Sequence, residues 1–244
     1  MSDLHGGNEQ LGQIIEHIER EYPGEKQFIF LGDYIDRGPQ TRELLNRLIT
    51  LDNGHNIFLR GNHDDMALGL SPNYVQSGFR NGFANWMSNG GEQTLKSYGV
   101  DWSKHHFSEE ALYNLFSQEH REWLLKHPYF YKDEQRTYVH AGFYRADAEG
   151  NPWPIETQNY QVLTWIRDPF LKDNSNAGGY VVHGHTPTIF YYSREPAMVD
   201  ICDNRCNVDT GAVYGGVLSA AIFDESRPGP IATIDHTGKH IKVS

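Results

Sequence analysis

Five short blocks of the sequence combine carboxylate, imidazole and amide side chains that can bind metal ions. One such block alone is more often a turn than a set of ligands. Together the five supply Asp, His, Asp, Asn, His and His, and we interpret them as the site of a hydrolase that uses two divalent ions. The blocks read Ser2-Asp3-Leu4-His5-Gly6, Gly32-Asp33-Tyr34-Ile35-Asp36-Arg37-Gly38, Gly61-Asn62-His63-Asp64, His140-Ala141-Gly142 and His183-Gly184-His185-Thr186.

The ligand types indicate which metals the site prefers. Three imidazoles, carboxylates and an amide oxygen are of intermediate softness, and no thiolate takes part, which favours Mn²⁺, Fe or Zn²⁺ over Ca²⁺. In sites with two such ions, one carboxylate bridges both, and the pair can generate hydroxide near neutral pH and bind phosphoryl oxygens. We therefore expect two divalent ions, with Mn²⁺ as the first candidate.

Four of the five blocks directly follow a predicted strand. Apolar residues at helical spacing predict helices over 8–22 and 41–51, and short apolar runs predict strands over 27–31 and 56–59. This alternation of strands and helices implies right-handed crossovers and a parallel sheet. Because ligands collect beyond the carboxyl ends of the strands in such sheets, the blocks should converge at one edge.

The rest of the chain predicts a helical insertion followed by more strands. The stretch 72–98 is aromatic and rich in glycine, and 108–126 has helical spacing. We expect a capping insertion at about 65–135 within a single domain that covers 1–244. Short apolar runs at 137–139 and 179–182 lead into His140 and His183, and strands of a second sheet are expected at 207–210, 217–223, 231–234 and 241–243.

Composition limits the partners and the location of the protein. A formal charge of −11 over 244 residues argues against a protein that binds the phosphate backbone of nucleic acids. No apolar run approaches the roughly 18–20 residues that span a bilayer. Met1 is followed at once by polar residues, so we expect no signal peptide and a soluble, cytoplasmic protein.

Two cysteines, Cys202 and Cys206, lie four residues apart. A disulfide requires a tight turn that brings their Cα atoms within about 7 Å. A zinc site would need two further ligands nearby, and none is evident. Two reduced structural thiols are the default interpretation, and the pair does not decide the redox compartment.

The blocks resemble those of the phosphoprotein-phosphatase branch of the calcineurin-like metallophosphoesterases, and above all its bacterial and phage Ser/Thr phosphatases. The resemblance covers Asp3 to about Phe223 and includes the stretches 86–100 and 207–212. It implies an α/β fold, a four-layer αββα sandwich with a helical capping insertion.

The resemblance also implies a role for each residue of the site. His63 would be the general acid that protonates the departing alkoxide, since an alcohol leaving group needs a proton as the P–O bond breaks. Asp36 would hold and polarise this imidazole. The implied metal ligands are Asp3 and His5 for the first ion, Asp33 as the bridge, and Asn62, His140 and His185 for the second ion.

Three arginines match arginines of the family. Arg37 and Arg60 precede glycines of the second and third blocks, and Arg167 follows Trp165 and Ile166. Guanidinium groups bind a tetrahedral phosphate through two hydrogen bonds, so the resemblance implies that these arginines bind the substrate phosphate. A surface ion pair with Asp168 is the alternative role of Arg167.

We expect hydrolysis of phosphate monoesters, foremost phosphoserine or phosphothreonine in proteins, by a bridging hydroxide that attacks phosphorus in line. No Cys or Ser is placed as a nucleophile, so we expect no phosphoenzyme. The substrate would be a phosphoprotein or a small phosphorylated molecule, and the oligomeric state stays open. The alternatives are symmetrical hydrolysis of dinucleoside polyphosphates such as Ap4A, a preference for phosphotyrosine, and a non-catalytic, metal-bound binding module.

Two departures from the family pattern bear on the site. Asp64 follows His63 where the family usually has Glu. The first block begins at Ser2, so the apolar strand that should precede it is missing. We expect that the natural reading frame, or a related fuller protein, has several apolar residues before Ser2, and that Asp3 and His5 are otherwise the weakest part of the site.

Overall fold

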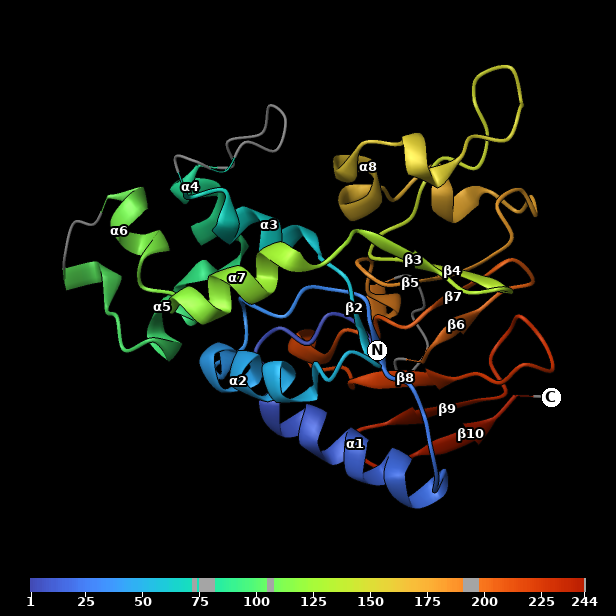
Figure 1. The fold of residues 1–244 in the computed structure, drawn as a ribbon, viewed down its shortest axis with the longest axis horizontal. Coiled ribbons are helices and arrows are strands. Elements are labelled where there is room, and N and C mark those ends of the chain that lie inside the picture. Colours follow the sequence, from blue (N-terminus) through green and yellow to red (C-terminus); the bar gives the residue numbers. More distant parts are fainter. Residues whose placement is uncertain (72–73, 75–81, 105–107, 191–197, 244) are drawn as a thin grey trace.

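The computed structural model of this chain describes residues 1–71, 74, 82–104, 108–190 and 198–243. Within these residues, sheets lie between two sets of helices (Figure 1). Helices α1 (Asn8–Glu21) and α2 (Thr41–Leu51) lie on one side, and α8 (Tyr160–Trp165) lies on the other. This arrangement confirms the expected α/β sandwich. No described helix is long and apolar enough to cross a membrane.

The first part of the chain alternates helix and strand as expected. Strands β1 (Ile29–Phe30) and β2 (Ile57–Phe58) pair in parallel, which confirms the parallel sheet, although both strands are shorter than the apolar runs that predicted them. Helices α1 and α2 confirm the two predicted helices. Each buries its apolar stripe, which consists of Leu11, Ile14 and Ile18 in α1 and Leu44, Leu45 and Leu48 in α2.

The later strands form two sheets. The five-stranded sheet has the order β3-β4-β5-β7-β6, and the three-stranded antiparallel sheet has the order β10-β9-β8. The strands are β3 (Phe130–Lys132), β4 (Arg136–Val139), β5 (Tyr180–His183), β6 (Asp200–Ile201), β7 (Arg205–Asn207), β8 (Ser219–Ile222), β9 (Ala232–Asp235) and β10 (His240–Lys242). The predicted strands near 217–223, 231–234 and 241–243 are confirmed as β8, β9 and β10.

The prediction of a second-sheet strand at 207–210 is wrong. The strand there is β7, which ends at Asn207 and pairs in parallel with β5 in the five-stranded sheet. Its three residues are all buried, but only Cys206 is apolar. Arg205 and Asn207 are buried because backbone carbonyls accept their side-chain hydrogen bonds, so this strand has no apolar pattern to reveal it.

Between β2 and β3 the described chain is mainly helical. The single helix expected at 108–126 is two helices, because Ser117 Oγ accepts a hydrogen bond from His120 N and starts a new helix. Residues 72–73, 75–81 and 105–107 of the expected insertion lie outside the described residues, and the insertion itself stays a prediction. The helices are α3 (Asn62–Leu68), α4 (Phe83–Trp86), α5 (Glu92–Ser97), α6 (Glu109–Tyr113) and α7 (Gln118–Lys126).

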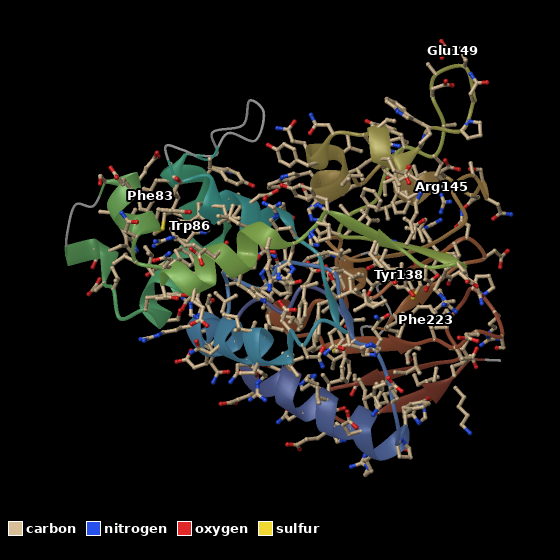
Figure 2. All side chains as sticks on the ribbon, in the orientation of Figure 1. Phe83, Trp86, Tyr138, Arg145, Glu149 and Phe223 are labelled. Atoms are coloured by element: carbon tan, nitrogen blue, oxygen red, sulfur yellow. The ribbon has the colours of Figure 1, made fainter. Side chains whose placement is uncertain are left out.

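Aromatic side chains pack between the five-stranded and three-stranded sheets. Figure 2 shows Tyr138 and Phe223 in this layer, with ring centroids 6.5 Å apart. Met1, Leu31 and Ala220 are among the residues that line a nearby groove of about 750 Å³. The groove borders the segment that carries Asp3 and His5.

Candidate active site

Strained backbone marks the predicted site. All six non-glycine residues with positive φ among the described residues belong to the blocks singled out in the sequence. Left-handed conformations cost free energy for residues other than glycine and cluster at functional sites. The six are Asp3 (φ 53°), His5 (φ 40°), Asp33 (φ 56°), Asp36 (φ 70°), Arg37 (φ 64°) and His185 (φ 69°).

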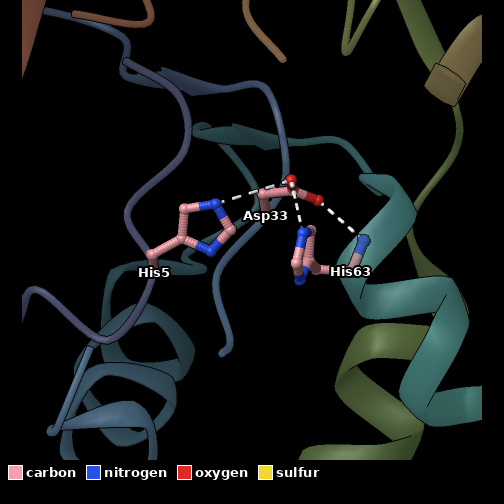
Figure 3. A group of neighbouring side chains, drawn as sticks. All are labelled: His5, Asp33 and His63. Carbon is pink, nitrogen blue, oxygen red and sulfur yellow. Dashed lines mark hydrogen bonds and ion pairs between the residues drawn. The ribbon is translucent and has the colours of Figure 1, made fainter. Parts of the chain in front are cut away.

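Asp33 stands at the centre of the cluster, in the loop that follows β1. Figure 3 shows the rings of His5 and His63 turned toward its carboxylate. Asp33 Oδ2 lies 3.7 Å from His5 Nε2 and 4.0 Å from His63 Nε2, and Oδ1 accepts a hydrogen bond of 2.9 Å from the His63 backbone N–H. Ligand atoms of these three buried residues lie within 4.8 Å of one another.

The same carboxylate belongs to a second group of ligand atoms. Asp33, His140 and His185 also offer atoms within 4.8 Å of one another, and all three are buried. His140 Nε2 lies 3.4 Å from Asp33 Oδ2 and 3.0 Å from Asn62 Oδ1. Asp33 is therefore the residue shared by both groups, which is the position of a bridging ligand.

Backbone carbonyls orient two of the imidazoles. The Nδ1 atoms of His5 and His140 lie 2.7 Å from Ile35 O and 2.8 Å from Leu31 O, respectively. With a proton on Nδ1, Nε2 is the ring nitrogen of each histidine that faces the cluster, and it can bind an ion once any proton on it is lost. Burial would lower the pKa of His140, but the Asp33 carboxylate raises it to about 10.

Asp3 is tied to the blocks around it. Its backbone N–H donates to Gly32 O at 3.1 Å, and its Oδ2 accepts hydrogen bonds from Ser2 Oγ at 2.6 Å and His185 N at 3.0 Å. Only 5% of the surface of Asp3 is exposed. The first and last blocks of the sequence are therefore in direct contact.

His63, a member of the first group, also forms a buried pair with Asp36. His63 Nδ1 lies 2.7 Å from Asp36 Oδ2. Trp86 Nε1 and Thr94 Oγ1 donate to the other side of the carboxylate, at 2.9 Å and 2.7 Å from Oδ1. Because three donors surround it, Asp36 is held in one orientation and fixes the ring of His63.

Asp64 has a structural role that the sequence did not reveal. Its Oδ2 accepts hydrogen bonds from the backbone N–H groups of Asp33 and Gly61, and its Oδ1 accepts one from Tyr34 N. The carboxylate therefore holds the Asp33 loop against the start of α3. In the sequence, Asp64 stands out only because it follows His63 at the position where the family usually has Glu.

The structure brings two of the three predicted arginines to the site. Arg37 Nη1 donates to His5 Nε2 at 2.6 Å. Arg37 and Arg167 line a pocket of about 230 Å³ together with Asp33, Asn62 and His185. The Asp168 carboxylate pairs with Lys172 at 2.7 Å, so the surface pair considered for Arg167 goes to another cation.

Arg60 is not brought to this pocket. Its guanidinium lies over the Tyr129 ring, 4.5 Å from the centroid, and 3.5 Å from Asp65 Oδ1. Nη2 donates to His127 O at 3.2 Å. Its assignment as a phosphate ligand stays a prediction from the sequence.

His183 and the two cysteines belong to neither group of ligand atoms. The ring of His183 packs edge-on against Phe170 at 5.0 Å between centroids, and burial lowers its pKa to about 3. Cys202 and Cys206 are both free thiols. Burial raises the pKa of the Cys206 thiol, so the reduced, structural interpretation fits this residue.

The donor set fits a pair of divalent cations. His185 Nε2 is buried and has no hydrogen-bond partner among the described residues, although its ring belongs to the second group. A buried imidazole nitrogen without a partner is costly unless something binds it. Three histidines, two carboxylates and one amide oxygen are the donors that such a site uses.

Known proteins with related sequences are phosphatases and nucleotide hydrolases. The chain is 28% identical over 225 residues to serine/threonine-protein phosphatase 1 of Salmonella typhimurium, an alignment that covers 91% of this chain and 89% of the relative. It is 25% identical over 242 residues to the asymmetrical bis(5'-nucleosyl)-tetraphosphatase PrpE of Anoxybacillus flavithermus, with 92% and 89% covered.

Solved structures share the fold over the whole chain. A putative diadenosine tetraphosphatase superposes with a TM-score of 0.60 at 18% identity and covers 99% of this chain and 90% of its own. The cold-active protein-tyrosine phosphatase of a psychrophilic Shewanella species gives 0.59 at 17% identity, with 100% and 79% covered. The family model of the calcineurin-like phosphoesterases matches residues 1–216. With this site and this match, the chain belongs to the calcineurin-like phosphoesterase family, whose members are metal-dependent hydrolases.

Proposed function

We propose that this protein hydrolyses phosphate monoesters, with phosphoserine and phosphothreonine in proteins as its substrates. The observation that supports monoester chemistry is the buried pair of His63 and Asp36, 2.7 Å apart, next to the shared ligand Asp33. A site that only bound a phosphate would need no positioned acid, whereas an alkoxide leaving group does.

The roles of the protein's own groups follow from their positions. His63 keeps Nδ1 on Asp36, so Nε2 is free to carry a proton to the leaving oxygen. Arg37 and Arg167 line the pocket and would bind the phosphate oxygens, where negative charge spreads in the transition state. Trp86 and Thr94 keep Asp36 in place and thus act on His63 indirectly.

The metal ions would be held by the two groups that share Asp33. His5 would bind one ion together with Asp3, whose Oδ1 lies 3.9 Å from His5 Nε2. His140 and His185 would bind the other together with Asn62, whose Oδ1 lies 3.0 Å from His140 Nε2, and Mn²⁺ is the first candidate. Bound there, two divalent ions supply Lewis acidity and a water of lowered pKa.

A second candidate function is hydrolysis of dinucleoside polyphosphates. The named relatives include an asymmetrical tetraphosphatase and a putative diadenosine tetraphosphatase, which supports this alternative as much as a serine/threonine phosphatase supports the first. The name of the PrpE relative indicates asymmetrical cleavage of the nucleotide, whereas the sequence favoured symmetrical cleavage as the rival.

Hydrolysis assays separate these functions. The metal-depleted protein should not hydrolyse p-nitrophenyl phosphate, and added Mn²⁺ should restore turnover. The restored enzyme is then compared on phosphoseryl peptides, phosphothreonyl peptides and diadenosine tetraphosphate. A clear preference for the dinucleotide would overturn the proposal, and the products, either two ADP or ATP with AMP, would identify the cleavage mode.

The same assay tests the binding-module alternative. Protein that holds its full complement of ions but hydrolyses none of the esters would be a metal-bound binding protein. His63→Asn is the internal control, because it removes the acid and leaves every proposed metal ligand in place.

A further inference from the structure

Two aromatic side chains remain exposed at the rim of the catalytic pocket. Phe190 is 66% exposed and Tyr214 is 44% exposed. Both line the same pocket as Asp33, Asn62 and His185. Their rings meet edge to face, with centroids 5.0 Å apart and an interplanar angle of 61°. Apolar surface left in water beside a polar site is typical of a binding surface.

The local backbone fixes this aromatic pair. Phe190 ends one short 3₁₀ helix and Tyr214 ends another, and each is closed by a hydrogen bond, from Phe190 N to Pro187 O and from Tyr214 N to Gly211 O. Thr188 N donates to Asp209 O at 2.9 Å and joins the two segments. The two rings are therefore positioned by structure and do not sit on independent loops.

Arg37 contacts both the aromatic pair and a ligand residue. Its guanidinium carbon lies 5.4 Å from the centroid of the Tyr214 ring, while Nη1 reaches His5 Nε2. The pocket thus combines cationic and ligand groups with aromatic rings, including those of Phe190 and Tyr214. An ester with an anionic phosphate and a planar leaving group offers a partner to each kind of group.

We propose that Phe190 and Tyr214 form a ring-binding subsite for the leaving group of aryl phosphates, so that phosphotyrosine in proteins is a substrate in addition to phosphoserine and phosphothreonine. Aromatic rings pair best edge to face or offset, and both Phe190 and Tyr214 have exposed surface that such a pairing could cover. A seryl or threonyl leaving group has no ring to cover them. This inference rests on the proposed function, because the phosphate must first bind at the shared ligand site.

Kinetics of a double variant test the subsite. Phe190→Leu combined with Tyr214→Leu keeps apolar volume but removes both rings. We expect KM for a phosphotyrosyl peptide to rise about tenfold, the effect expected for loss of aromatic pairing. For a phosphoseryl peptide of the same sequence, KM should change less than about twofold.

Trp153→Leu is the matched control. Trp153 is 40% exposed and stacks on Tyr144 with centroids 5.7 Å apart, outside the pocket. Equal losses on the two peptides in the double variant, or the same selective loss in Trp153→Leu, would overturn the subsite. A selective loss on diadenosine tetraphosphate alone would also overturn it and assign the rings to a nucleobase.

A binding measurement separates failure of the subsite from failure of the proposed function. Calorimetry on the Mn²⁺-loaded protein compares phenylphosphonate with methylphosphonate, neither of which has an ester bond to cleave. We expect tighter binding of phenylphosphonate, and loss of this difference in the double variant. If no ester is hydrolysed but the difference persists, the proposed function is wrong and the subsite stands. Hydrolysis without any difference would reject the subsite alone.

Discussion

The two ligand groups that share Asp33 are supported in different ways. On the second-ion side, Asn62, His140 and His185 follow β2, β4 and β5, and β4 and β5 pair directly in the five-stranded sheet. On the first-ion side, Asp3 and His5 lie in a segment that belongs to no assigned strand. That segment is hydrogen-bonded to β1 from Met1 N to Ile29 O, but Asp3 and His5 themselves contact loop residues, from Asp3 N to Gly32 O and from His5 N to Asp33 O.

One site can therefore combine ligands that a sheet holds in place with ligands whose positions depend on contacts with loops. A sheet fixes its strand ends through many hydrogen bonds, so the second-ion ligands are positioned before any ion binds. The first-ion ligands are positioned only as well as the loops they contact. We therefore expect the second-ion side to bind its ion more tightly, and the following predictions test that ranking.

The largest effect is expected from Asp33→Asn, which removes the carboxylate that both sides share. Both ions should be lost, and turnover of p-nitrophenyl phosphate should fall by more than about 100-fold. Mutation of a residue that only orients a metal ligand already lowers metal affinity or activity by up to about 100-fold, so loss of a shared ligand should lower it further. Elemental analysis and the rate together check the prediction. A variant that keeps two ions would show that the two sides do not depend on a common ligand.

His63→Asn should separate catalysis from ion binding on the first-ion side. His63 lies 4.0 Å from Asp33 but pairs with Asp36, so we expect the ion content to stay unchanged. Turnover of alkyl phosphates should fall about 10²–10⁴-fold, the usual contribution of a general acid. Turnover of p-nitrophenyl phosphate should fall less, because its leaving group needs no proton. Equal losses on both esters would contradict the assignment.

The two sides should differ in the pH dependence of ion binding. Burial would lower the pKa of His140, but Asp33 raises it to about 10, so below that pH the ring carries a proton that a second-side ion must displace. Its apparent affinity should therefore rise about tenfold for each pH unit toward that value. Burial lowers the pKa of His5 well below its ordinary value, so this ring has no proton to lose.

Manganese titrations at several pH values check this difference, and proton release into weakly buffered solution gives a second readout. His140→Asn is the matched variant, because an amide ligand removes the titrating ring. Identical pH slopes for the two ions, or an unchanged slope in the variant, would count against the proposed difference.

The smallest effect on substrate binding is expected at Arg60. Its guanidinium faces Asp65 and Tyr129, so Arg60→Lys should change KM for an aryl phosphate by less than about threefold. Arg37→Lys should raise KM by about tenfold or more, since a charge-assisted hydrogen bond is lost. Equal effects of the two substitutions would restore the sequence-based role of Arg60.

The positions of Asp33, Asn62 and His140 were predictable because each closely follows a strand whose apolar run is visible in the sequence. Arg60 precedes this same kind of turn, yet its side chain packs against Tyr129, a partner 69 residues away by residue number. Asp36 likewise depends on Trp86 and Thr94, which lie 50 and 58 residues along the chain. Local spacing carries no information about such distant partners, so roles that depend on them need the structure.

The six left-handed residues of the site lower the stability of the folded protein, although the activity depends on their side chains. Each such conformation costs on the order of 1–3 kcal/mol, and a folded domain has only about 5–15 kcal/mol of net stability. Glycine adopts the same conformation without this cost. Laboratory selection for heat resistance alone should therefore replace residues such as Arg37 or His185 by glycine before it alters the buried core. The durable variants would be inactive, and selection would have to include turnover to keep the enzyme.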